Sequence, residues 1–486
     1  MQVDSVPRHT ERMIKRDTLN IIMNPRTTIG VLTETEVLLV DAVGGKRVLR
    51  SLLLPAEASD LSGLAEFLWQ AELTEVWVLP TTTHSRTVTC AGLAQVHHWT
   101  TVVHPALGHP ERPACVLLWP REGGRSGNRR LALAFPEHSG WGWVLPDAKG
   151  LLATVTYLDQ VLGRSVADAP ELVAPQLLTE LTADQPTMSL RASQLELSHL
   201  PTSDDMPSPI LQGAREFAWM RPLLLAEQRE RYLHKYTHLS LALEAAMSVH
   251  LGAGMPQHSP TGRAYDGRHP GLWRVEAEPA GSLFDGRRLP SCLDGEWMST
   301  PQVQCCRSIG YQVHIREGYA WPEAHPVLQR WAAILWQAAE RLHTRPQLFR
   351  HGQARTNASS TLTRLAELGL APLAQEQAVG RWGRPEWWAS LVGGSRAALF
   401  AHLVRLVRKG TMPVLVAHDA LWVVSNDPDP LTAVPGLVTA RNWQGYSVGY
   451  VDPLPLSGEV QAAFRTTDDA SQLAQMLDTL ARDVFP

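Results

Sequence analysis

A polar stretch from Ala167 to Pro209, rich in Pro, Ser and Asp, divides the chain in two. This composition is typical of linkers between domains, and it predicts a boundary near residue 205. With 486 residues in all, each side is long enough to bury a core of its own. We therefore predict a flexible arm at residues 1–25, one domain at residues 26–205 and a second at residues 206–486.

The composition is that of a folded protein with nearly balanced charge. Lys plus Arg (44) almost equal Asp plus Glu (48), which gives a net charge of −4, and 44% of the residues are hydrophobic. No apolar run reaches the roughly 18 residues of a membrane helix, and the N-terminal segment lacks the apolar core of a signal peptide. We therefore expect a cytoplasmic protein that binds no membrane. Any binding to nucleic acid must come from a local concentration of positive charge.

The first half alternates strand and helix patterns. Residues 28–54 hold two β-rich runs around Gly44-Gly45, which predict a hairpin. Apolar residues at helical spacing predict a helix at residues 60–71, and a short apolar run predicts a buried strand at residues 75–80. This order of hairpin, helix and strand resembles the opening of RNase H-like α/β folds.

Two glutamates of this half, Glu34 and Glu36, have the spacing that puts side chains on one face of a strand. That arrangement permits a metal site, but a solvated turn at a hairpin tip fits the same residues and is the commoner case. We therefore expect no working exonuclease centre here. The histidines at His97-His98 and His250 have no ligand-like spacing to Cys or Asp, so the sequence predicts no zinc site.

The second half contains four recognisable stretches in order. The first is a strand pattern that ends at Thr237 and leads into a helix pattern. The second is a pair of alternating runs around a short helix at residues 301–308, and the third is a helical stretch at residues 357–372. The fourth is a long helix followed by residues 413–425, which predict two strands with Asp419 at the turn between them.

In this order the stretches resemble the palm and fingers of family-B DNA polymerases, over roughly residues 215–455. The residues that carry the resemblance are Tyr236, Thr300, Pro301, Gly310, Glu317, Gly318, Tyr319 and Asp419. The resemblance implies an α/β chain in which an RNase H-like, exonuclease-like domain precedes a polymerase-like palm and fingers.

The resemblance also implies where catalytic carboxylates should lie. Family-B enzymes hold two Mg²⁺ ions between aspartates of two neighbouring strands. In this chain Thr237 stands where the first strand carries its aspartate, Ala417 takes the first position of the hairpin motif and Asp419 takes the second. The sugar-selecting tyrosine of the family is replaced by Ala242. One carboxylate of three remains, and a lone carboxylate binds Mg²⁺ weakly.

The fingers helix of the family carries a lysine that neutralises the incoming triphosphate. Its position falls near Thr361, and the only basic residue on this stretch is Arg364, one helical turn away. Whether Arg364 replaces the lysine stays open, because guanidinium binds phosphate well but its reach differs.

Arginines are concentrated beside this helix, and no acidic residue lies between Arg341 and Ala366. Such a stretch is typical of a surface that contacts a phosphate backbone, although a solvated Arg-rich loop is the alternative. The candidate nucleic-acid-binding residues are Arg341, Arg345, Arg350, Arg355, Arg364 and Arg396.

The sequence favours a nucleic-acid-binding protein with a degenerate family-B polymerase fold, a bacterial pseudoenzyme that serves replication or maintenance of a mobile element or linear replicon. The expected partners are DNA, single-stranded or primer–template, and replication or mobile-element proteins. One alternative is an active minimal polymerase that uses Asp419 as its Mg²⁺ ligand. The other is a non-catalytic interaction scaffold. No cofactor is expected unless the protein is catalytic, in which case it is Mg²⁺.

Overall fold

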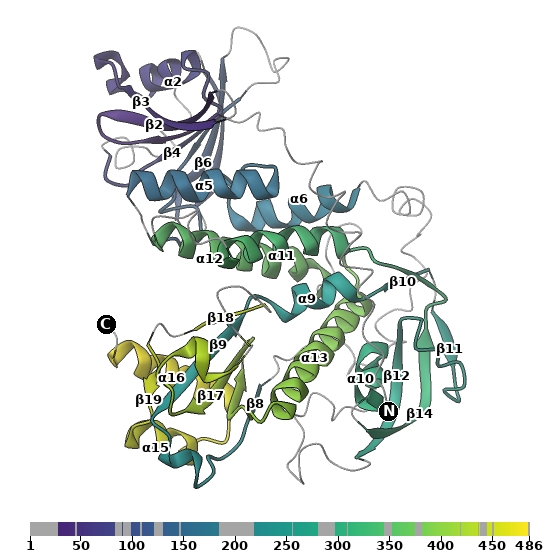
Figure 1. The fold of residues 1–486 in the computed structure, drawn as a ribbon. Helices are drawn as coiled ribbons and strands as arrows, with labels where there is room; N and C mark the ends of the chain where they lie inside the picture. The colour runs from purple at the N-terminus through teal and green to yellow at the C-terminus, as the bar shows by residue number, and fades with distance from the viewer. Residues whose placement is uncertain are drawn as a thin grey trace. The chain divides into compact units, whose positions relative to one another are not determined.

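The computed structural model describes residues 28–183, 218–279, 297–344, 352–374, 382–437 and 445–484, with short gaps at 44–45, 83–89, 91–98, 107–108, 121–129, 145–146, 255, 309, 418, 436 and 450–451. It has a mixed α/β architecture (Figure 1), as the motifs imply. The chain forms two compact units: unit 1 comprises Met1–Gln176 and Arg345–Leu368, and unit 2 comprises Leu177–Thr344 and Gly369–Pro486. The predicted boundary near residue 205 lies outside the described residues. No described helix is long and apolar enough to cross a membrane.

Unit 1 contains a seven-stranded sheet with the order β3-β2-β1-β4-β7-β6-β5. The strands are β1 (Ile29–Leu32), β2 (Glu36–Val43), β3 (Lys46–Leu53), β4 (Glu75–Val78), β5 (Trp99–Ala106), β6 (His109–Pro120) and β7 (Leu131–Ala134). The first three strands are antiparallel, whereas β4 runs parallel to β1 and β7 runs parallel to β4. The predicted hairpin at residues 28–54 and the predicted strand at residues 75–80 are therefore confirmed.

Capped helices pack on this sheet. The helix α2 (Leu61–Gln70) begins at Asp60, whose side chain accepts a 2.7 Å hydrogen bond from the Gly63 N–H, the typical N-cap arrangement. The helix α5 (Ala148–Leu162) contacts β1 and β2. The helix α12 (Gly352–Leu370) also joins this unit, because the Trp143 indole N–H donates to the Thr361 hydroxyl at 2.7 Å.

A further helix, α6 (Pro170–Ala183), occupies part of the stretch predicted as a linker, so that prediction is wrong for these residues. Val173, Ala174, Leu177 and Leu178 recur at helical spacing and are all buried. Burial of this apolar stripe outweighs the helix-breaking tendency of Pro175 inside the helix.

Unit 2 contains two larger sheets. The first is called the palm-like sheet because it contains the two motif strands, one with Thr237 near its end and the other beginning directly after Asp419. It has the order β18-β9-β17-β16-β8, with β19 paired to β9, and the second sheet has the order β11-β14-β12-β13. The strands of the palm-like sheet are β8 (Ala218–Met220), β9 (Tyr232–His238), β16 (Leu415–Ala417), β17 (Ala420–Ser425), β18 (Tyr446–Val448) and β19 (Leu454–Pro455). Those of the second sheet are β11 (Gln257–Ser259), β12 (Gly271–Pro279), β13 (Trp297–Ser299) and β14 (Tyr311–Ala320), and a separate pair is β10 (Leu251–Ala253) with β15 (Glu323–His325).

The long helix α13 (Pro385–Arg408) lies between the two larger sheets (Figure 1). Its residues Phe400 and Leu403 share one apolar cluster with Leu421 of the palm-like sheet and Trp273 of the second sheet. The other helices of this unit are α9 (Leu241–Ser248), α10 (Thr300–Ser308), α11 (Gln329–Thr344), α15 (Gly458–Thr466) and α16 (Ala470–Val484). The predicted helix at residues 301–308 is confirmed as α10, and Gly310 follows it with a φ of +96°, as a C-terminal cap requires.

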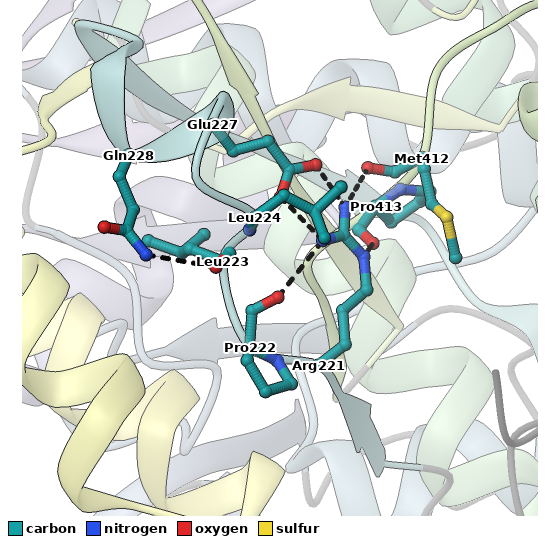
Figure 2. A network of polar contacts seen from close by, with 8 residues as sticks. All are labelled: Arg221, Pro222, Leu223, Leu224, Glu227, Gln228, Met412 and Pro413. Atoms are coloured by element: carbon teal, nitrogen blue, oxygen red, sulfur yellow. Dashed lines mark hydrogen bonds and ion pairs between the residues drawn. The ribbon is translucent and has the colours of Figure 1, made fainter.

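The buried Arg221, which directly follows the edge strand β8, links this strand to the residues that precede β16 (Figure 2). The Arg221 guanidinium donates to both carboxylate oxygens of Glu227, at 2.6 and 2.5 Å, and to the carbonyl oxygens of Met412 and Pro413. A planar guanidinium satisfies these four acceptors at once, which a lysine could not do. This network fixes the strand that leads to the turn at Asp419.

Candidate functional site

The structure brings Thr237 and Asp419 together at one end of the palm-like sheet. The strands β9 and β17 are antiparallel neighbours, and their register pairs Thr237 with Ala420, the residue directly after Asp419. The His238 N–H donates to the Asp419 carbonyl at 2.6 Å. Thr237 and Asp419, the two motif positions, therefore lie side by side, one in β9 and the other in the turn that leads into β17.

Asp419 also has a structural task at this edge. It lies in the tight turn between β16 and β17 and adopts a φ of +56°, a left-handed conformation that aspartate tolerates better than most residues. Its Oδ2 accepts a hydrogen bond of 3.3 Å from the Leu241 N–H in the first turn of α9. A negative charge is favourable there because the helix dipole is positive at its N-terminus. Asp419 thus joins the hairpin to α9.

The first position of the hairpin motif is part of the hydrophobic core. Ala417 is fully buried and belongs to an apolar cluster that includes Trp422 of β17 together with Leu473 and Leu477 of α16. Ala420, the partner of Thr237, belongs to the same cluster. An ionised carboxylate at Ala417 would be desolvated by these side chains, so this position cannot contribute to a Mg²⁺ site in the present packing.

The same face of β9 is tied to the C-terminal helix. Lys235 lies two residues before Thr237, and its Nζ contacts both carboxylate oxygens of Asp478 at 2.7 and 2.9 Å. The ammonium group also lies 5.1 Å from the centroid of the Trp422 ring. Side chains at alternate positions of a strand share a face, so α16 packs on the side of the sheet to which Thr237 belongs.

On the opposite face, three side chains from three elements converge: His238 at the end of β9, Glu244 in α9 and His402 in α13. Glu244 Oε1 lies 3.2 Å from His402 Nε2, and Glu244 Oε2 lies 3.2 Å from His238 Nε2. Burial raises the pKa of the Glu244 carboxyl, but the two histidines overcome this effect and hold the pKa well below its usual range. Burial also lowers the pKa of His402, which favours the neutral imidazole.

No local sequence pattern predicts this cluster. The histidines considered for metal ligation from the sequence, His97-His98 and His250, do not include His238 or His402. The two histidines are far apart in the chain, and no short motif links them. Only the packing of α9 and α13 against the end of β9 brings them together.

The predicted phosphate-binding arginines are distributed over both units. Arg341 lies in α11 and Arg396 in α13, both in unit 2, whereas Arg355 and Arg364 lie in α12 within unit 1. Arg345 and Arg350 lie outside the described residues. The Arg364 Nη2 contacts Glu171 Oε1 at 3.3 Å, so part of its charge is neutralised within unit 1. A common basic surface stays a prediction.

The position expected for the fingers lysine, Thr361, is fully buried in unit 1. Its hydroxyl accepts from the Trp143 indole and donates to the Asn357 carbonyl at 2.8 Å. A lysine at this position would replace a satisfied hydroxyl in a packed interior. The helix α12 therefore uses this face for packing.

The glutamates considered for an exonuclease centre lie at the turn that joins β1 and β2. Glu34 is exposed, and Glu36 accepts a hydrogen bond from the Ser51 hydroxyl on β3. A different glutamate of this unit is perturbed: burial raises the pKa of Glu75 to about 7. Its Oε1 accepts from the Trp77 indole at 2.6 Å, which offsets only part of the burial effect.

Comparisons with known proteins give distant likenesses only. No protein-family model matches the chain, and no curated protein matches it. Solved structures of phi29 DNA polymerase match 88% of this chain and 86% of their own. Among them are an orthorhombic crystal form (9% identity, TM-score 0.36), the complex with primer-template DNA (10%, 0.40) and the complex with single-stranded DNA (9%, 0.36). Likenesses of this degree assign no function to the chain.

Proposed function

We propose that this protein binds nucleic acid with a polymerase-like palm that does not extend primers efficiently. The observation that supports this most directly is the register of β9 and β17, which sets Asp419 beside Thr237. In the family that the motifs resemble, this is where carboxylates from two strands meet.

The chemistry of the proposed palm is limited by its ligands. Phosphoryl transfer by two Mg²⁺ ions needs several carboxylate oxygens that converge, because Mg²⁺ otherwise keeps its water. Asp419 supplies one carboxylate, and its Oδ2 is engaged by α9. Thr237 offers a hydroxyl, Ala417 offers no ligand, and Glu244 faces two histidines. The proposed palm therefore has too few carboxylates to hold two Mg²⁺ ions.

The topology of unit 1 supports an RNase H-like origin for the first domain. Three antiparallel strands precede β4, which returns parallel to β1 in the middle of the sheet. This is the arrangement that an exonuclease-like domain would need. Its turn glutamates, Glu34 and Glu36, do not lie in a buried carboxylate cluster, so we propose that this domain is inactive as well.

The proposed ligand is DNA, single-stranded or primer–template, bound through arginines that contact phosphates. A protein with a polymerase-like fold but without nucleotide-transfer activity suits a structural role in replication or maintenance of a mobile element or linear replicon. The protein would then act together with replication proteins that supply the missing catalysis.

Primer extension and DNA binding, measured on the full chain, test this proposal together. We expect fluorescence anisotropy to detect binding that weakens steeply between roughly 50 and 200 mM salt. Arg396→Ala and Arg355→Ala should weaken binding, whereas Arg465→Ala in the exposed C-terminal part of α15 serves as the matched control. We expect no extension with Mg²⁺ or Mn²⁺.

Two outcomes would contradict the proposal in different ways. Robust extension that Asp419→Ala abolishes would identify an active minimal polymerase. No binding of either DNA form at low salt, with no effect of the arginine variants, would identify an interaction scaffold.

A further inference from the structure

The cluster of His238, Glu244 and His402 has the composition and spacing of a metal site. One ligand atom from each residue lies within 4.8 Å of the others, and this is the only such group of three or more among the residues that the structure describes. The side chain of His238 is 0% exposed and that of His402 is 5% exposed, whereas Glu244 is 29% exposed. The cluster is therefore shielded by the two imidazoles and open to solvent on the side of the carboxylate.

Several polar atoms of the cluster have no hydrogen-bond partner within the described residues. They are both ring nitrogens of His238 and the Oε2 of Glu244. His238 Nε2 and Glu244 Oε2 lie 3.2 Å apart but lack the angles of a hydrogen bond. Buried polar atoms without partners are rare and costly in folded proteins. His238 Nε2 and Glu244 Oε2, 3.2 Å apart and not hydrogen-bonded, are therefore placed as two ligands of one cation would be.

The surroundings leave room beside the ligand atoms. Gly445 has a φ of +85°, and a Cβ on this residue would lie 2.4 Å from His238 Nε2. Any residue other than glycine at position 445 would therefore fill the space next to His238 Nε2. The ring centroid of the next residue, Tyr446, lies 4.8 Å from that of His238 and 5.4 Å from that of His402. The buried Tyr446 hydroxyl has no hydrogen-bond partner among the residues that the structure describes.

We propose that His238, Glu244 and His402 bind a divalent transition-metal ion, with Zn²⁺ as the best fit. Two imidazoles and one carboxylate form a ligand set typical of Zn²⁺ sites that keep a fourth position for water. Nitrogen ligands disfavour Mg²⁺ and Ca²⁺, which prefer oxygen. Tyr446, whose ring packs against both imidazoles, would supply the hydroxyl that hydrogen-bonds a water in the fourth position.

This metal would be distinct from the Mg²⁺ of a polymerase. His238 and Thr237 are consecutive in a strand, so their side chains point to opposite faces of the sheet. The ion would join the end of β9 to α9 and α13, directly behind the backbone of Asp419, to which the His238 N–H donates. It would therefore stabilise the turn that contains Asp419 and the helix α9 that contacts it.

The test uses the full-length protein, stripped with a chelator and titrated with ZnCl₂ alone. We expect one Zn²⁺ bound per chain, a rise in the thermal unfolding midpoint with added Zn²⁺, and a visible absorption band with Co²⁺ typical of four-coordinate nitrogen and oxygen ligands. Loss of an outer-shell partner already lowers metal affinity by roughly 10–100-fold. Glu244→Gln and His402→Gln should therefore each weaken Zn²⁺ binding by about 100-fold or more.

The matched control is His250→Gln, because His250 is an exposed histidine of the same unit and lies just after α9. This variant should bind Zn²⁺ like the unmodified protein. Circular dichroism without metal establishes that each variant is folded. The proposal is wrong if the unmodified protein binds no Zn²⁺ at micromolar concentrations, or if it binds Zn²⁺ with unchanged affinity in folded Glu244→Gln.

Discussion

Ala417→Asp introduces a carboxylate at the first position of the hairpin motif, and the structure predicts that it destabilises the fold without producing primer extension. Ala417 is fully buried among apolar side chains and pairs with Ala218 of β8 and Ala420 of β17. At pH 7 the native state can avoid a buried charge only by protonating the new carboxyl. Holding a group with an ordinary pKa near 3.9 protonated at pH 7 costs about 3 pKa units, or about 4 kcal/mol. Burial of the neutral carboxyl adds roughly 1–3 kcal/mol.

The total of roughly 5–7 kcal/mol is comparable to the whole stability of many domains. At pH 5 the protonation cost is only about 1–2 kcal/mol, because the unfolded carboxyl is then closer to its own pKa. The folded pKa lies above the unfolded one, so the variant should lose stability as pH rises from 5 to 7. Urea unfolding followed by tryptophan fluorescence at both pH values measures the difference.

Ala401→Asp is the matched control, since Ala401 is an exposed residue of α13 in the same unit. We expect it to cost about 0.5 kcal/mol, with little dependence on pH. The prediction is wrong if Ala417→Asp unfolds at the same urea concentration as the unmodified protein at pH 7, or if it supports primer extension.

Three further perturbations probe other parts of the structure. Glu75→Gln should remove a pH dependence of stability. In the unmodified protein the folded pKa of Glu75, about 7, exceeds the ordinary 4.5, so the free energy of unfolding should fall by about 3 kcal/mol as pH rises from about 4.5 to 7. Urea titrations should show this fall in the exposed control variant Glu66→Gln but not in Glu75→Gln. Lys235→Met should cost only about 0.2–1 kcal/mol, because Asp478 is 39% exposed and water can solvate its carboxylate once the cation is removed. The loss should be absent in Lys235→Met/Asp478→Leu if the pair is the cause. Gly393→Ala should lower the melting temperature, because the added Cβ would lie 1.9 Å from the Ser299 hydroxyl and the clash should cost about 1–3 kcal/mol of stability. Gly352→Ala should leave the melting temperature unchanged, because the space around Gly352 is open.

Local patterns in the sequence were sufficient for most of the elements. The hairpin around Gly44-Gly45, the Asp60 cap of α2 and the turn at Asp419 all depend on residues a few positions apart, which is the range over which hydrogen bonding and side-chain periodicity act. The same reasoning failed for α6. There, a polar composition around the segment concealed an apolar stripe that the fold buries.

The sequence by itself determined which positions of the polymerase-like motifs lack a carboxylate, because an absent side chain needs no structure to be recognised. Only the tertiary structure decided what fills their place. Ala417 joins an apolar core because α16 packs against it, and Thr361 points into unit 1 because Trp143 binds its hydroxyl. The histidine and glutamate cluster arises from three elements whose proximity depends on long-range strand and helix packing, which no local spacing encodes.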